Sequence, residues 1–239
     1  TGVVFPIEEV GKICKKARVL FHTDAVQAPG KLKINVEEMN VDFLSLSAHK
    51  LHAPKGIGML YIKHKTPFKP LIIGGHQERK RRGGTENVPY IIGFGKAAEI
   101  SLSCFSEENT RVRALRDRLE EGILSTISNT RLNGHKSLRL PNTTNIAFDF
   151  IEAEAIIMMF DQLGICVSSG SACTTGSMDA SHVLSAMGLS AMQARGSVRF
   201  SLSRYNRQEE VDYILKHLPP IVSKLRAMSP LSEAHPDNI

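Results

Sequence analysis

Residues 43–62 read FLSLSAHKLHAPKGIGMLYI, two apolar segments joined by a short polar stretch that contains proline and glycine. The first segment, residues 43–47, has the length and composition of a buried strand, and His49 and Lys50 follow closely after it. The second segment, residues 57–62, comes after a proline and a glycine, which is typical of a strand that starts after a turn. The pattern predicts two strands, with polar side chains gathered where the first one ends.

A helix and a further strand are expected before this stretch. Apolar residues recur at helical spacing over residues 7–17, and a short apolar segment at residues 19–21 leads into the polar end of a strand at Asp24. Helices that alternate with short apolar strands predict an α/β fold with a mostly parallel sheet. Such sheets bind their ligands at strand ends and in the loops beyond, which is where Asp24 and Lys50 both fall.

The second half of the chain has a different pattern. One of two expected helices, residues 107–127, has an apolar face formed by Val112, Leu115, Leu119, Ile123 and Ile127. The other expected elements are a helix at residues 88–103, strands at 145–148, 166–167 and 198–202, and helices at 152–163 and 207–226. We therefore expect an α+β region after a domain boundary near residues 104–107.

Composition limits the classes of function. The chain has 239 residues, of which 42% are hydrophobic, and a net charge of +6. Its densest cationic run, residues 79–82, is not part of a long basic stripe with interleaved aromatics, so we expect a loop and no nucleic-acid partner. The four cysteines form no Cys-x-x-Cys pair, and no apolar run is long enough to span a membrane. These features predict a soluble, cytoplasmic protein with reduced thiols and no membrane association.

Asp24 and Lys50 point to a cofactor site. A carboxylate after an apolar strand needs a partner, because burial of an unpaired charge is costly. Lys50 can supply an amine for a Schiff base, and Ser47 and His49 add a hydroxyl and an imidazole beside it. Pyridoxal phosphate requires these parts: an amine for its aldehyde, an acid for its pyridine nitrogen and donors for its phosphate. For Lys50 taken alone, an ordinary solvated lysine is the alternative.

A run of small residues, SSGSAC at residues 168–173, ends in a thiol. Because the run contains no bulky side chain, we expect an exposed loop over about residues 166–180 in which Cys173 reacts as a thiolate. A chance cysteine in a turn is the alternative for this run alone. We expect Cys166 to be buried and structural. Combined with the amine of Lys50, the soft nucleophile Cys173 predicts an enzyme that moves sulfur.

The chain resembles the cysteine desulfurases over almost its whole length. The matching segments are TGVV at residues 1–4, HTDAVQ at 22–27, SAHK at 47–50, PKGIG at 54–58, GGHQER at 74–79 and GGTEN at 83–87. SGSAC at 169–173 and LSRY at 202–205 are most similar to the NifS branch, which is associated with nitrogenase cluster assembly. The resemblance implies a fold-type-I pyridoxal-phosphate enzyme of the class-V aminotransferase superfamily. Residues 1–105 would be the remainder of its large cofactor-binding domain, and residues 106–239 a small domain with the cysteine loop.

The resemblance also implies a role for the matching side chains at the cofactor. Lys50 would form the Schiff base and then act as acid and base. Asp24 would pair with the pyridine nitrogen and Gln27 with the phenolic oxygen of the ring. Ser47 and His49 would bind the phosphate. His49 thus stands with Lys50 and Cys173 among the expected catalytic residues, but in phosphate binding rather than proton transfer.

Further roles concern the neighbouring subunit and the substrate. Thr85 would reach the phosphate of the partner's cofactor, which implies a homodimer. Arg199 would hold the substrate carboxylate, because the planar fork of a guanidinium matches a carboxylate; a surface charge at a strand end is the alternative. The implied reaction converts L-cysteine to L-alanine and leaves the sulfur on Cys173 as a persulfide for an iron–sulfur scaffold protein. No permanent metal is expected, although Cys173 could transiently ligate an iron–sulfur cluster.

Other interpretations stay open. The chain could be another pyridoxal-phosphate enzyme, such as a selenocysteine lyase or an aminotransferase, although transamination needs no thiol at Cys173. It could also be an inactive truncated chain or a scaffold. The family's complete proteins are longer at the front by about 150 residues, more than a small domain. We therefore expect this chain to pair with an N-terminal fragment of the same protein.

Overall fold

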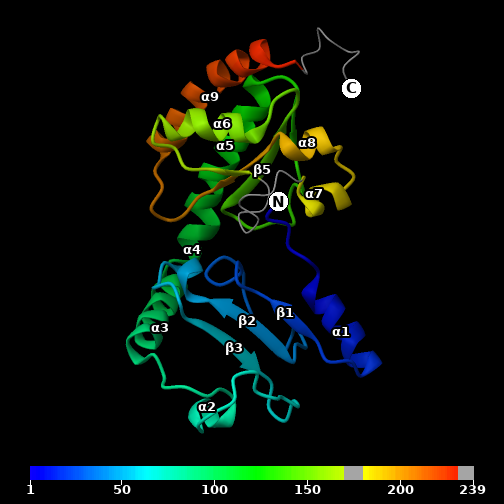
Figure 1. The fold of residues 1–239 in the computed structure, drawn as a ribbon, viewed down its shortest axis with the longest axis vertical. Helices are drawn as coiled ribbons and strands as arrows, with labels where there is room; N and C mark the ends of the chain where they lie inside the picture. The colour runs from blue at the N-terminus through cyan, green and yellow to red at the C-terminus, as the bar shows by residue number, and fades with distance from the viewer. Residues whose placement is uncertain (170–179, 231–239) are drawn as a thin grey trace. The chain divides into compact units, whose positions relative to one another are not determined.

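The computed structural model describes residues 1–169 and 180–230. The chain divides into two compact units, Phe5–Ser106 (the N-terminal unit) and Thr1–Val4 with Glu107–Ile239 (the C-terminal unit). Figure 1 shows a small sheet with helices in the first unit and a second sheet with helices α5, α6 and α9 in the second. In the described part of the chain, no helix combines the length and the apolar character that a membrane crossing requires. The assignment of the units to a cofactor domain and a catalytic-loop domain stays a prediction.

The N-terminal unit is built around a three-stranded sheet in the order β1-β2-β3. Its elements are α1 (Ile7–Ala17), β1 (His22–Asp24), β2 (Phe43–Ser47), the 3-10 helix η1 (Ala48–Leu51), β3 (Gly58–Ile62), α2 (Gln77–Lys80) and α3 (Val88–Ser103). The central strand β2 pairs in parallel with β1 and antiparallel with β3. Val41 and Leu44 are almost fully buried beneath the sheet, and Ile7 of α1 packs against them. The predicted helix at 7–17 and strand at 43–47 are confirmed.

Two expectations for this unit need correction. The strand predicted at residues 19–21 is wrong: Val19 and Leu20 are 59% and 54% exposed, and the strand is the next three residues. The reason is that α1 ends at Arg18 in the left-handed conformation, and pairing with β2 starts only where His22 lies opposite Phe43. The α/β class is confirmed, but the described sheets are mixed and antiparallel rather than mostly parallel. The short connection from β2 to β3 leaves no room for the crossover that a parallel pair needs.

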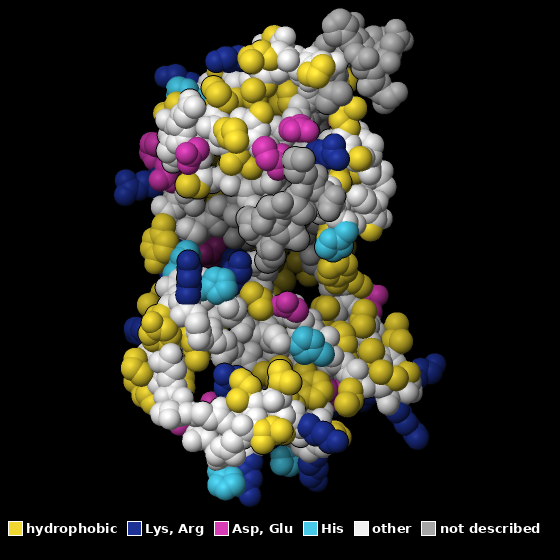
Figure 2. Space-filling view, in the orientation of Figure 1, with side chains coloured by type: hydrophobic (Ala, Val, Ile, Leu, Met, Phe, Trp, Pro, Cys, Tyr) yellow, Lys and Arg dark blue, Asp and Glu magenta, His cyan; other side chains and the backbone are white. Residues whose placement is uncertain are grey.

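The surface of the N-terminal unit carries large apolar side chains (Figure 2). Leu71 and Ile73, in the loop before α2, are 94% and 87% exposed, and Ile92 of α3 is 66% exposed. Singly exposed apolar residues are normal, but Leu71 and Ile73 lie two residues apart in one loop and are both largely exposed.

The C-terminal unit contains a four-stranded antiparallel sheet in the order β4-β5-β7-β6. The elements from residue 105 onward are α4 (Phe105–Glu107), the π-helix η2 (Glu108–Val112), α5 (Arg113–Thr126), β4 (Thr130–Leu132), β5 (Thr143–Phe148), α6 (Ala153–Asp161), β6 (Ser168–Ser169), α7 (His182–Ala186), α8 (Ala191–Arg195), β7 (Ser197–Ser201) and α9 (Gln208–Met228). The predicted helices at 107–127, 152–163 and 207–226 and strands at 145–148 and 198–202 are confirmed within a few residues.

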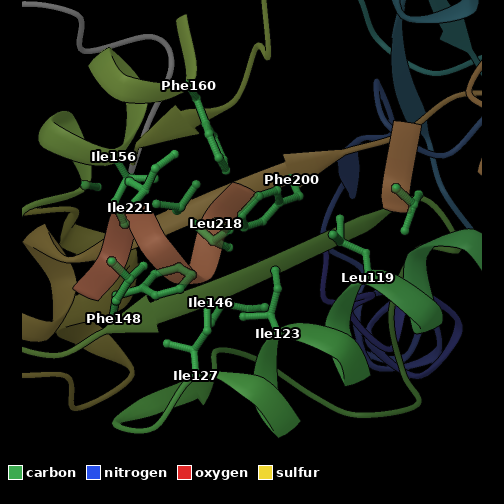
Figure 3. Close-up of a cluster of buried hydrophobic side chains, with 14 of the residues drawn as sticks. Leu119, Ile123, Ile127, Ile146, Phe148, Ile156, Phe160, Phe200, Leu218 and Ile221 are labelled. Atoms are coloured by element: carbon green, nitrogen blue, oxygen red, sulfur yellow. The ribbon is translucent and has the colours of Figure 1, made fainter. Parts of the chain in front are cut away.

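A continuous apolar core joins one face of this sheet to its helices (Figure 3). Ile146 and Phe148 of β5 and Phe200 of β7 are almost fully buried, and Phe160 of α6 meets Phe200 edge-on with the ring centres 6.5 Å apart. All five apolar positions predicted for the helix at 107–127 are buried here as well. Full burial of one such side chain stabilises a fold by roughly 1.5–3 kcal/mol. The opposite face of the same strands is free for polar groups.

Two expectations near residue 166 are wrong. The short strand is Ser168–Ser169 rather than residues 166–167, because pairing with β7 starts where Ser168 lies opposite Arg199. Cys166 precedes that pairing and is exposed rather than buried. Cys173 and most of the expected loop at 166–180 lie outside the described residues.

Candidate active site

The side chains expected to hold a cofactor lie where two parallel strands end. Asp24, the last residue of β1, lies opposite Ser45 of β2, so the carboxyl ends of both strands meet at one edge of the sheet. The Oδ1 of Asp24 accepts a hydrogen bond of 2.9 Å from the backbone N–H of Val26. An aspartate commonly forms such a turn with the N–H two residues on. The turn orients an exposed carboxylate whose Oδ2 has no partner among the described residues.

Ser47, His49 and Lys50 follow β2 within one tight turn. Ala48 and Leu51 of η1 are buried, with 0% and 4% exposure, and they anchor the turn to the unit. With these two side chains inside, His49 is exposed and Lys50 is half-buried. The Oγ of Ser47 lies 2.8 Å from Nδ1 of His49. The structure therefore brings Ser47 and His49 into direct contact and places Lys50 on the same turn.

A hollow of about 430 Å³ opens beside this turn. Its wall is formed by Ser47, His49 and residues 55–58. Gly56 has φ of 93°, a conformation that glycine adopts without strain. The hydroxyl, the imidazole and the ammonium group of Lys55 are donors that suit an anion such as phosphate. The sequence analysis included the segment around Lys55 but gave this lysine no role. The only feature of the sequence that could have pointed to Lys55 was the glycines nearby.

Gln27 and Thr85 are both exposed in loops of the N-terminal unit. Gln27 lies in the turn after β1, three residues beyond Asp24, so it shares the strand end with the carboxylate. Thr85 lies in the segment between α2 and α3, away from the strand ends in sequence. Their exposure leaves both side chains accessible to a ligand.

Sequence reasoning missed a polar pair next to Asp24. The Nε2 of His22 lies 2.8 Å from the Oγ of Ser45. His22 and Asp24 are two residues apart in β1 and therefore share a face of the sheet. The sequence of β1, His-Thr-Asp, has no apolar alternation, so the exposure of His22 and Asp24 on one face is evident only from the structure.

Arg199 lies in the C-terminal unit, in the middle of β7. Its cross-strand partners are Asn145 of β5 and Ser168 of β6. The side chain is half-buried, and its Nε is a buried donor without a hydrogen-bond partner among the described residues. An unpaired buried donor is unusual because it costs the full desolvation of the group. Arg199 thus has capacity to bind an anion.

A metal site is not evident in the residues that the structure describes. Within residues 1–169 and 180–230, no three histidine, cysteine, aspartate or glutamate side chains gather closely enough to hold an ion. The donors at the end of β2, a hydroxyl, an imidazole and amines, can bind an anion.

Comparison with known proteins shows similarity to one family over most of the chain. The family model described as aminotransferase class-V matches residues 1–214. Cysteine desulfurase 2 of Trichormus variabilis is 56% identical over 237 residues, which are 99% of this chain and 59% of that protein. Cysteine desulfurase NifS of Azotobacter vinelandii is 53% identical over 230 residues, 96% of this chain and 57% of that protein. The chain therefore spans less than two thirds of the length of these relatives.

Solved structures show the same similarity. A structure described as a NifS-like protein matches with a TM-score of 0.85 and 39% identity, covering 94% of this chain and 58% of its own. The NifS-like protein from Rickettsia africae matches with a TM-score of 0.85 and 36% identity, covering 93% and 59%. The described fold is thus similar to part of a larger fold.

Proposed function

This chain belongs to the class-V aminotransferase family, whose members depend on pyridoxal phosphate, and from that premise we propose that it acts as a cysteine desulfurase. The observation that carries the proposal is the register of β1 and β2, which puts Asp24 at the same sheet edge as the turn with Ser47, His49 and Lys50. Relatives named cysteine desulfurase, which match over 96–99% of the chain, support the proposed substrate class.

The described residues fit pyridoxal phosphate. The hollow beside Ser47 and His49 has anion donors on its wall, Asp24 offers a carboxylate with a free oxygen, and Lys50 offers a primary amine on the adjoining turn. We propose that Ser47 and His49 bind the phosphate, Asp24 faces the pyridine nitrogen, Gln27 the phenolic oxygen, and Lys50 the aldehyde. When bound, the cofactor withdraws electrons from the α-carbon of an amino acid attached to it.

Different side chains of the protein then carry out different steps of the reaction. Arg199 holds the substrate carboxylate, and Lys50 moves the proton at the α-carbon. The thiolate of Cys173 attacks the sulfur of L-cysteine. A sulfur–sulfur bond forms as the bond from sulfur to the β-carbon breaks. The three-carbon remainder leaves as L-alanine after its β-carbon gains a proton, equivalent to the one lost by the Cys173 thiol, and its α-carbon regains the proton held by Lys50. Cysteine and one enzyme thiol thus give alanine and one persulfide, so atoms and electrons balance.

We extend the proposal to the assembly and the partners of the protein, on the basis of the same family membership. Thr85 contacts the cofactor phosphate of a second copy, so the working form is a homodimer. An iron–sulfur scaffold protein accepts the sulfur in the cytoplasm, in the nitrogenase-associated branch of the family. The similarity to a protein named NifS supports this branch.

Two variants test the proposal. In Cys173→Ser, sulfide release from L-cysteine should fall by about 100-fold or more, because no thiolate remains to take the sulfur. In Lys50→Ala, the visible absorbance of the bound cofactor should disappear. Unchanged sulfide release in Cys173→Ser would refute the persulfide step, and a wild-type protein without cofactor absorbance would favour an inactive scaffold. Faster turnover of L-selenocysteine than of L-cysteine would favour a selenocysteine lyase.

A further inference from the structure

A row of polar side chains crosses the sheet of the C-terminal unit and includes Arg199. Asn145 of β5 is a cross-strand partner of Arg199 in β7. On the other side of β5, Asn133 donates its backbone N–H to the carbonyl oxygen of Asn145 at 2.8 Å, which extends the pairing of β4 with β5. Cross-strand partners in antiparallel sheets project from the same face. Asn133, Asn145 and Arg199 therefore lie side by side on the face opposite the apolar core.

The hydrogen bonds in this row fix the orientation of each group. The hydroxyl of Ser197 donates its one proton to the carbonyl oxygen of Gln193 at 2.7 Å, so it accepts from Asn133 Nδ2 at 2.9 Å. The same Nδ2 donates to Oδ1 of Asn145 at 2.7 Å. A reversed carboxamide at Asn145 would place two donors against each other. The network therefore assigns Oδ1 of Asn145 to Asn133 and leaves Nδ2 as its outward donor.

Two neighbouring donors in this row lack an acceptor among the described residues, and the buried Oδ1 of Asn133 lacks a donor there. Asn145 is 3% exposed, and none of the described residues accepts a hydrogen bond from its Nδ2. The Nε of Arg199 is buried and likewise without an acceptor in the described part of the chain. Cross-strand neighbours have Cβ atoms about 4.5–5.5 Å apart. A single anion with two oxygens, such as a carboxylate, can satisfy a neutral and a cationic donor at that spacing.

We propose that Asn145 binds the carboxylate of the amino-acid substrate together with Arg199, and that Asn133 and Ser197 position the Asn145 carboxamide for this role. The proposal rests on the proposed function, which assigns Arg199 to that carboxylate. Arg199 supplies the positive charge, and Asn145 supplies a hydrogen-bond donor whose orientation is fixed. Because the Asn145 donor is held by two further residues, it is oriented before the substrate arrives, and no ordering is needed on binding.

The test uses the protein loaded with pyridoxal phosphate and two variants of Asn145. Asn145→Asp keeps the volume and the acceptor for Asn133 but removes the donor, and Asn145→Ala removes the donor without adding a charge. In both, the KM for L-cysteine and the dissociation constant of L-alanine, measured by calorimetry, should rise about tenfold or more, while kcat changes less. In Asn145→Asp the new carboxylate would also pair with Arg199, so Asn145→Ala is the deciding variant, and a purely structural role would leave both of its constants unchanged.

Asn142→Ala is the matched control. Asn142 is 9% exposed in the same unit, where its Nδ2 donates to the carbonyl oxygen of Leu202 at 2.9 Å. This variant should lower the melting temperature but keep both constants within about twofold of wild type. Wild-type constants in both Asn145 variants would overturn the inference. If the wild type binds alanine in an Asn145-dependent manner but releases none from cysteine, the carboxylate site stands and the proposed desulfurase function fails.

Discussion

Asp24 has two tasks that can be separated within one side chain. Its Oδ1 accepts a hydrogen bond from the N–H of Val26 and so shapes the turn after β1, while its negative charge is proposed to face the pyridine nitrogen. An asparagine at this position would keep an oxygen in the place of Oδ1 and lose the charge. The structural task needs only an acceptor, whereas the proposed chemical task needs a carboxylate that stabilises a protonated ring nitrogen.

Asp24→Asn should therefore leave the fold intact and impair the chemistry. The free energy of unfolding should stay within about 0.5 kcal/mol of wild type, because the group is exposed and its turn hydrogen bond survives. The rate of alanine release from L-cysteine should fall about 100-fold or more, the usual scale for loss of one preorganised electrostatic partner. Denaturant unfolding and a steady-state assay on the same preparation check both statements. A fully active Asp24→Asn enzyme would remove Asp24 from the site.

The sequence could predict part of the site at this scale, and the limit is physical. Lys50 comes three residues after the apolar strand β2, so local pattern alone was enough to put it near a strand end. Asp24 does end a strand, but that strand is His22–Asp24 and not the apolar segment before it. The partnership of Arg199 with Asn145 depends on the register of two strands far apart in the chain, which local pattern does not encode. The roles of all four residues toward a cofactor or substrate stay predictions. Cys173 lies outside the described residues.

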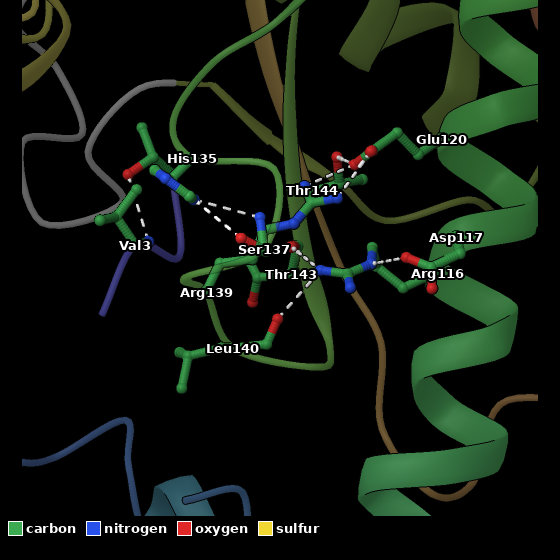
Figure 4. Close-up of polar contacts among 11 residues, drawn as sticks. Val3, Arg116, Asp117, Glu120, His135, Ser137, Arg139, Leu140, Thr143 and Thr144 are labelled. Carbon is green, nitrogen blue, oxygen red and sulfur yellow. Dashed lines mark hydrogen bonds and ion pairs between the residues drawn. The ribbon is translucent and has the colours of Figure 1, made fainter.

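At the scale of elements, a buried ion pair joins α5 to the segment before β5 (Figure 4). Both nitrogens of the Arg139 fork donate to Glu120 of α5 at 2.6 Å, and the hydroxyl of Thr144 donates to the same carboxylate at 2.6 Å. Arg116, also on α5, donates to the carbonyl oxygens of Leu140 and Thr143 at 3.0 and 3.3 Å. A buried pair of this kind is strongly destabilised when one partner is removed, because the other charge stays buried.

This cluster makes stability depend on pH. Burial acts to raise the pKa of Glu120, but hydrogen bonds from Arg139 and Thr144 and the charges of Arg139 and Arg116 outweigh it and hold the pKa below the ordinary 4.5. A lowered pKa in the folded state means that the stabilisation is fully present above 4.5 and is lost as pH falls through the folded value. Glu120→Gln should lower the free energy of unfolding by about 3 kcal/mol at neutral pH.

The difference between wild type and Glu120→Gln should shrink as pH falls below 4.5. Denaturant unfolding across that range measures it. Glu121→Gln is the control, because Glu121 is the next residue of the same helix and is exposed. It should change stability little at any pH. A difference between wild type and Glu120→Gln that stays constant with pH would show that the ion pair does not set this dependence.

Elements with a clear period were predictable, and those set by pairing were not. The helix that contains Leu119 and Ile123 was evident because its apolar face repeats every three or four residues. The antiparallel pairing of β3 follows from a short connection, and the start of β1 follows from where its partner begins. Both features depend on a partner strand, which local pattern does not show. The apolar segment at residues 19–21 was therefore mistaken for the strand.

At the scale of the whole molecule, the two units differ in the size of their buried apolar clusters. The core cluster of the C-terminal unit extends over α5, α6, α9, β5 and β7. The fully buried part of the corresponding cluster in the N-terminal unit is Ala25, Val41 and Leu44, with partly buried residues around it. The same unit exposes Leu71 and Ile73. Since burial of apolar area is the main stabilising contribution to folding, we expect the N-terminal unit to be the less stable of the two and to gain more from the proposed second copy.

Hydrogen exchange on the 239-residue chain tests this difference directly. Backbone amides of β5 should exchange at least about tenfold more slowly than those of β2, because the smaller core opens at a lower free energy. The comparison is internal to one sample, so concentration and temperature are the same for both sheets. Pairing within each sheet is similar, since β2 and β5 are both central strands with a neighbour on either side. Equal protection in the two sheets would mean that the smaller core suffices alone, and the argument for a stabilising partner at the N-terminal unit would then fail.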